Sequence, residues 1–166
     1  MTDRSDILVW VIYGQGGKGP LSYGFIKFAD RLRAMGYSVH DEYLWKYPYA
    51  IAKVLDASGY QKKAVLGYSM GANCITWISN IIKKPIDLAV AYDPSIGIPL
   101  IPAKIEPVSD KIQRCIHYRG MVGYPGMAKL EGPTVETIPT YTPHLGICYS
   151  EHLHRITLGV LADLEK

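Results

Sequence analysis

A serine stands between two glycines in the pentapeptide Gly67-Tyr68-Ser69-Met70-Gly71. The pattern G-x-S-x-G is typical of a nucleophilic serine on a tight turn between a strand and a helix, where small residues on both sides allow a close backbone approach. Such a turn would lift the Ser69 hydroxyl above the sheet edge and point the N–H of Met70 at the same place. The predicted chemistry is attack on a carbonyl carbon, which also needs a base, an acid and donors for the oxyanion.

A second glycine pattern lies nearer the N-terminus. Gly14, Gly16 and Gly19 satisfy G-x-G-x-x-G, the fingerprint of a loop that holds the pyrophosphate of a dinucleotide. In that fingerprint the third glycine already belongs to the helix, but here Gly19 precedes Pro20, and a residue before proline is disfavoured in the helical region. Three interpretations remain: an oxyanion loop in which the N–H of Gln15 faces the serine, a dinucleotide loop, and a tight structural turn.

The acidic pair Asp41-Glu42 bears on the same choice. It lies near the end of the second predicted strand, where a dinucleotide site would place the carboxylate that binds ribose. The late start of the helix nevertheless disfavours a dinucleotide loop. The glycines favour the oxyanion interpretation, because they allow the unusual backbone angles that such a loop requires.

The elements that would position these residues alternate between strand and helix. Residues 7–13 are continuously apolar and β-branched, as in a strand buried on both faces. Apolar spacing predicts a helix from Pro20 to a stop at Gly36. Further strands are predicted over residues 37–44, 62–68, 86–92, 114–119 and 134–138, and further helices over 49–59, 72–83 and after the N-cap Ser150. This alternation predicts an α/β fold, a three-layer α/β/α sandwich with a mostly parallel sheet of about six strands.

With the serine motif at such a junction and two strand-helix units before it, the chain resembles the α/β-hydrolase superfamily, specifically its small serine esterase or lipase-like members, over most of its length. The resemblance implies that the catalytic histidine follows the last strand and precedes the final helix. His144 lies there. His152 and His154 fall within the final helix and are expected on its surface, while His117 and His40 fall within strands and are interpreted as structural.

The acid of the resembled family follows a strand between the serine and the histidine. Asp93 comes at the carboxyl end of the strand after the serine helix, at the edge where ligands bind in such sheets. The more usual position, after the next strand, falls in residues 118–132, which contain no Asp and only Glu131; Asp110 is a further alternative. The expected catalytic residues are Ser69, His144 and Asp93, with the N–H groups of Gln15 and Met70 as the oxyanion hole.

Composition limits the partners. The 166 residues are 48% hydrophobic and 20% charged, typical of one globular domain, 1–166, without a cap domain. The net charge of +3 comes from scattered basic residues, so no nucleic-acid partner is expected. No apolar run is long enough to cross a bilayer and no secretion signal is apparent, so a cytoplasmic protein without a membrane partner is expected. Three widely spaced cysteines match no metal pattern, and neither a metal nor an organic cofactor is implied.

The activity expected from the resemblance is hydrolysis of a small-molecule carboxylic ester. Thioesters and amides use the same machinery. Tyr68 and Tyr124 are expected to contact the substrate in an open cleft. Two alternatives stay open: a hydrolase-like binding protein without catalysis, which the missing acid after the penultimate strand supports, and a dinucleotide-binding oxidoreductase.

Overall fold

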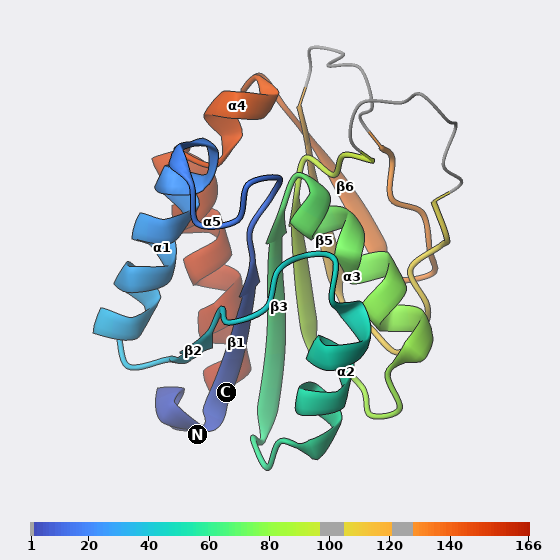
Figure 1. The fold of residues 1–166 in the computed structure, drawn as a ribbon. Coiled ribbons are helices and arrows are strands. Elements are labelled where there is room, and N and C mark those ends of the chain that lie inside the picture. Colours follow the sequence, from blue (N-terminus) through green and yellow to red (C-terminus); the bar gives the residue numbers. More distant parts are fainter. Residues whose placement is uncertain (1, 97–104, 121–127) are drawn as a thin grey trace.

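Six parallel strands form one sheet in the order β2-β1-β3-β4-β5-β6 (Figure 1). The structure is a computed structural model that describes residues 2–96, 105–120 and 128–166. The strands are β1 (Ile7–Ile12), β2 (Ser38–His40), β3 (Lys62–Tyr68), β4 (Leu88–Tyr92), β5 (Cys115–Gly120) and β6 (Val135–Thr140). All neighbouring pairs run parallel, which confirms the predicted sheet.

Helices cover both faces of the sheet. They are α1 (Tyr23–Ala34), α2 (Pro48–Ala57), α3 (Met70–Ile81), α4 (His144–Ile147) and α5 (Glu151–Ala162). Figure 1 shows α1 and α5 on one side and α2 and α3 on the other. Successive side chains of a strand point to opposite faces, so Val9 of β1 packs in one core cluster and Trp10 in the other. The predicted three-layer sandwich is confirmed, with no cap domain evident among the described residues.

Because every strand runs in the same direction, their carboxyl ends share one edge of the sheet. The glycine loop follows β1, Ser69 follows β3, Asp93 follows β4 and His144 comes shortly after β6. In open α/β sheets this edge is the one where ligands bind.

Several predicted boundaries differ from the structure by two or more residues. The strand expected over residues 37–44 is only the three-residue β2, an edge strand that pairs on one side with β1 from Leu8↔Ser38 to Trp10↔His40. Helix α3 starts directly after Ser69 rather than at residue 72. The N-cap of α5 agrees with prediction, since the side chain of Ser150 accepts a hydrogen bond from the N–H of Leu153.

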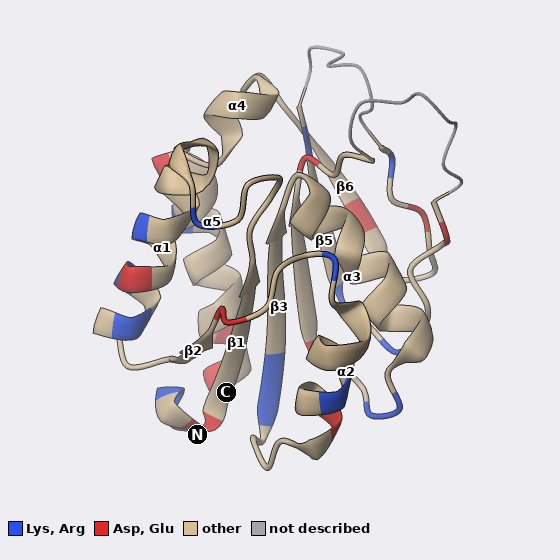
Figure 2. Ribbon diagram, in the orientation of Figure 1, with Lys and Arg blue, Asp and Glu red and all other residues tan. Residues whose placement is uncertain are grey.

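Charged side chains are spread over several elements. Figure 2 shows Lys and Arg on helices on both sides of the sheet and at the start of β3. Of the helices in the described ranges, none has the length and apolar character needed to cross a bilayer.

Candidate active site

Ser69 lies on a strained turn between β3 and α3. Its φ of 56° is in the left-handed region, which non-glycine residues rarely adopt. A Cβ on Gly67 would lie 2.5 Å from the carbonyl oxygen of Gly71, and a Cβ on Gly71 would overlap the carbonyl oxygen of Ile12. Both glycines of the motif are therefore required by close backbone contacts, as expected for a turn that exposes a nucleophile.

Three side chains from separate segments meet at this turn. His144, the first residue of α4, has its Nε2 3.0 Å from Oγ of Ser69. Its Nδ1 lies 2.9 Å from Oδ2 of Asp93. All three residues are buried, with exposures of 6% for Ser69, 7% for His144 and 0% for Asp93. The structure thus brings together the three residues predicted from the sequence, with His144 between Ser69 and Asp93.

Both carboxylate oxygens of Asp93 have hydrogen-bonding partners. Oδ1 accepts a hydrogen bond from the N–H of Gly120 at 2.9 Å, while Oδ2 faces the imidazole of His144. A Cβ on Gly120 would lie 2.7 Å from Oδ2, so the end of β5 can approach the carboxylate only because this residue is glycine. The backbone of Asp93 also has a left-handed φ, 48°, and its N–H donates to the carbonyl of Tyr118. These contacts fix one orientation of the acid.

The alternative acids lie elsewhere. Asp110 precedes β5 and Glu131 precedes β6, so both are near the amino ends of strands, at the edge opposite Ser69. Both are exposed, and Glu131 pairs with Lys129 at 3.3 Å. Only Asp93 among these three carboxylates contacts His144.

The glycine loop passes directly beside the nucleophile. A Cβ on Gly14 would lie 2.9 Å from Cβ of Ser69. Gly16 and Gly17 have φ values of 84° and 61°, and the N–H of Gly17 closes a turn onto the carbonyl of Gly14. The N–H of Met70, in the first turn of α3, has no acceptor within its own helix. That Gln15 and Met70 donate to an oxyanion stays a prediction.

Comparison with known proteins adds to this geometry. No protein-family model and no curated protein matches the sequence. Solved structures, in contrast, do match this chain.

A point variant of SOBER1 from Arabidopsis thaliana shares 10% identity over 96% of this chain and 99% of its own, with a TM-score of 0.61. One of the metagenome-derived lipolytic enzymes LipS and LipT shares 12% identity over 98% and 96%, with a TM-score of 0.60. Mouse α/β-hydrolase domain-containing protein 10 shares 10% identity over 99% and 91%, with a TM-score of 0.58. The chain has the α/β-hydrolase fold.

Within this α/β-hydrolase fold, the carboxylate of Asp41 is already engaged by three side chains of the protein. It accepts a hydrogen bond from the hydroxyl of Tyr13 at 2.7 Å and pairs with Lys18 at 3.0 Å and Arg33 at 2.9 Å. Burial acts to raise the pKa of Asp41, but the three donors outweigh it and hold the pKa below its ordinary value. Gly19 is extended, with φ −89° and ψ −177°. Both features disfavour the dinucleotide interpretation.

Tyr68 does not have the exposed position expected of a substrate contact. Its side chain is buried at 2% exposure. Its ring stacks on the imidazole of His144, and its hydroxyl donates to the backbone carbonyl of the same residue. The contacts indicate that Tyr68 orients the histidine. Tyr124, the other expected substrate contact, lies outside the described residues.

The remaining histidines are not at the site. His152 is exposed on α5, as expected, but His154 is 3% exposed and stacks on Phe28 with ring centroids 4.1 Å apart. The prediction of a surface position for His154 was wrong. Burial lowers the pKa of His154 and of His117 to about 4 each. Both are core imidazoles.

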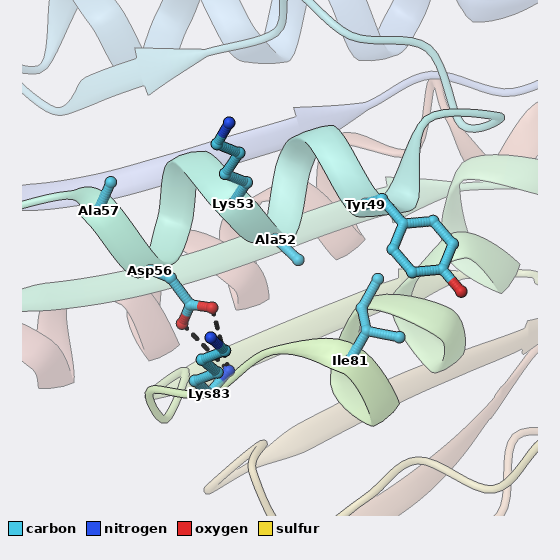
Figure 3. Close-up of a pocket in the computed structure, with 7 residues that line it drawn as sticks. All are labelled: Tyr49, Ala52, Lys53, Asp56, Ala57, Ile81 and Lys83. Atoms are coloured by element: carbon cyan, nitrogen blue, oxygen red, sulfur yellow. Dashed lines mark hydrogen bonds between the residues drawn. The ribbon is translucent and has the colours of Figure 1, made fainter.

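A separate cavity of about 570 Å³ lies between α2 and α3 (Figure 3). None of the expected site residues that the structure describes is among its lining residues. Its floor includes Ala52 and Ile81, and the carboxylate of Asp56 accepts hydrogen bonds from the N–H groups of Lys83 and Lys84. These bonds tie the end of α2 to the turn after α3. In residues 2–96, 105–120 and 128–166, no group of three His, Cys, Asp or Glu side chains could hold a metal.

Proposed function

We propose that the protein is a serine hydrolase that cleaves carboxylic esters. The observation that carries the proposal is the hydrogen-bonded chain from Ser69 through His144 to Asp93, built on a strained turn of the α/β-hydrolase fold. A strained serine backed by a base and an oriented acid is the arrangement that nucleophilic catalysis requires.

In the proposed reaction, Oγ of Ser69 attacks the ester carbonyl carbon while Nε2 of His144 takes the hydroxyl proton. The carbonyl oxygen becomes an oxyanion that accepts hydrogen bonds from the N–H groups of Met70 and Gln15. Collapse of this tetrahedral intermediate breaks the ester C–O bond, and the alcohol leaves with the proton from Nε2. Water then attacks the acyl-enzyme by the same route and releases the carboxylic acid. Asp93 keeps the Nδ1 proton in place and stabilises the imidazolium.

The alternative of a hydrolase-like binding protein relied on the missing acid after the penultimate strand. The contact of Asp93 with His144 counts against that argument, because it supplies a candidate acid after β4 instead. A binding protein would also have no need for a left-handed serine, which costs about 1–3 kcal/mol of backbone strain.

The decisive test is covalent labelling with a fluorophosphonate probe. We expect one adduct, on the peptide that contains Ser69, and no adduct in Ser69→Ala. His144→Ala should abolish labelling and turnover of p-nitrophenyl acetate, whereas the exposed His152→Ala should leave both intact. Folded wild-type protein that neither labels nor hydrolyses esters would overturn the proposal.

A further inference from the structure

The glycine loop has one side-chain tether. Four of its six residues, 14–19, are glycines, and Gln15 is exposed. In this loop, which the structure describes in full, only the side chain of Lys18 forms an ion pair. Its Nζ lies 3.0 Å from Oδ1 of Asp41 and 5.9 Å from the centre of the Tyr13 ring.

Asp41 is well placed to anchor that lysine. Its side chain is 8% exposed and follows the edge strand β2. Oδ2 accepts from the hydroxyl of Tyr13, which directly follows β1, while Oδ1 also pairs with Arg33 of α1 at 2.9 Å. The carboxylate therefore joins the ends of two strands and one helix, and a buried carboxylate with several partners is a rigid acceptor.

The tether is close to the chemistry. Lys18 is three residues after Gln15, whose N–H is the proposed oxyanion donor, and four after Gly14, on which a Cβ would lie 2.9 Å from Cβ of Ser69. A loop of glycines has large conformational freedom, so a donor on it is aligned only if the loop is held.

We infer that Asp41 and Lys18 are positioning residues, which hold the glycine loop against Ser69 so that its N–H group is aligned with the oxyanion. The inference rests on the proposed hydrolase function and adds to it. It predicts that the ion pair contributes to stabilisation of the transition state rather than to binding of the ground-state ester.

The test compares Lys18→Met with wild type in steady-state hydrolysis of p-nitrophenyl acetate. The variant keeps the aliphatic stem but removes the charge, and the lysine side chain is 54% exposed, so the fold should persist. We expect kcat to fall roughly tenfold to a hundredfold, with KM changed less than about threefold. Lys18→Arg should restore most of the lost kcat, and affinity for a boronic acid, which mimics the tetrahedral oxyanion, should fall in parallel with kcat.

A matched control is available at the opposite sheet edge. Lys62 at the start of β3 pairs with Asp87 at 3.1 Å and is also partly exposed. Lys62→Met removes a comparable ion pair without touching the loop, so it should leave kcat within about twofold of wild type. In Asp41→Asn, kcat should fall at least as far as in Lys18→Met, and the double variant should be no worse than Asp41→Asn, because both changes break the same tether.

The outcomes separate this inference from the proposed function. If wild type labels at Ser69 and turns over ester, but Lys18→Met keeps wild-type kcat and boronate affinity, the tether is only structural and the inference is wrong. If Lys18→Met and Lys62→Met lower kcat equally, the effect is general destabilisation, which also overturns it. If wild type itself shows no activated serine, the proposed function fails first.

Discussion

The ring of Tyr68 and the imidazole of His144 are stacked, with centroids 5.5 Å apart and planes 26° from parallel. The Tyr68 hydroxyl also donates to the His144 carbonyl at 3.3 Å. Tyr68, the last residue of β3 and the neighbour of Ser69, thus contacts His144 with both its ring and its hydroxyl.

We expect the two contacts of Tyr68 to be separable. Tyr68→Phe keeps the ring and loses only a long hydrogen bond, so kcat should fall by no more than about fivefold. Tyr68→Leu loses the stacked plane and should lower kcat further, because the imidazole is less well oriented. Circular dichroism would check that both variants are folded. Equal kcat in the two variants would show that stacking does not matter for the base.

Asp93→Asn should keep the fold and lower ester turnover by up to about ten-thousandfold, because an amide favours the wrong imidazole tautomer. Asp110→Asn and Glu131→Gln serve as matched controls at the other edge of the sheet and should retain activity. A large loss in Glu131→Gln alone would move the acid to the position more usual in the family, and a loss in none would indicate a Ser-His dyad.

Gly14→Ala should lower kcat by about tenfold or more, since the new Cβ would meet Cβ of Ser69 at 2.9 Å and push the glycine loop away from the nucleophile. Gly59→Ala is the control: a Cβ there meets nothing within 4 Å. Both variants would be compared by kcat and by melting temperature. Unchanged kcat in Gly14→Ala would mean that the loop does not act at Ser69.

Acid should destabilise the fold through its buried histidines. The pKa of His154 is about 4 in the folded protein against an ordinary value of 6.5, so the unfolded chain binds a proton that the folded protein excludes. This contribution to stability is complete above about pH 6.5 and is lost as the pH falls toward 4, at up to about 1.4 kcal/mol per pH unit. His117 adds to the effect with the same sign.

Urea unfolding at about pH 7 and about pH 5 would measure this loss. His154→Phe keeps a planar ring against Phe28 and should lose less stability between the two pH values than wild type. The exposed His152→Gln should behave as wild type. Identical pH dependence in wild type and His154→Phe would contradict a neutral, buried imidazole at this position.

From the sequence we could predict the parallel sheet and the three side chains that meet at its edge. Apolar runs and glycine stops are local signals, and parallel strands necessarily end on one side, so Ser69 and Asp93 could be assigned to a common edge. The resemblance to α/β hydrolases, rather than any local signal, pointed to His144. The buried position of His154 also has a signal in the sequence. His154 follows Leu153 and precedes Thr157 by three residues, which places it on the buried face of α5.

Other features had no local signal. The partners of Asp41 come from β1, the glycine loop and α1, and no spacing relates them. The stacking of Tyr68 on His144 spans 76 residues and depends on how α4 packs. Such contacts arise only when elements are assembled, which is why Tyr68 was expected to face substrate rather than the histidine.

The segments that carry Ser69, Asp93 and His144 follow different strands of the sheet. The turns bearing Ser69 and Asp93 are bonded to each other, since the N–H of Ser69 donates to the carbonyl of Tyr92 and the N–H of Ser95 donates to the carbonyl of Ser69. His144 comes later in the chain, just after β6, which lies at the edge of the sheet. Because the ribosome makes residues 69 and 93 before residue 144, a nascent chain that ends before α4 would lack the proposed base. Under the proposed function, such a chain would not yet hydrolyse esters.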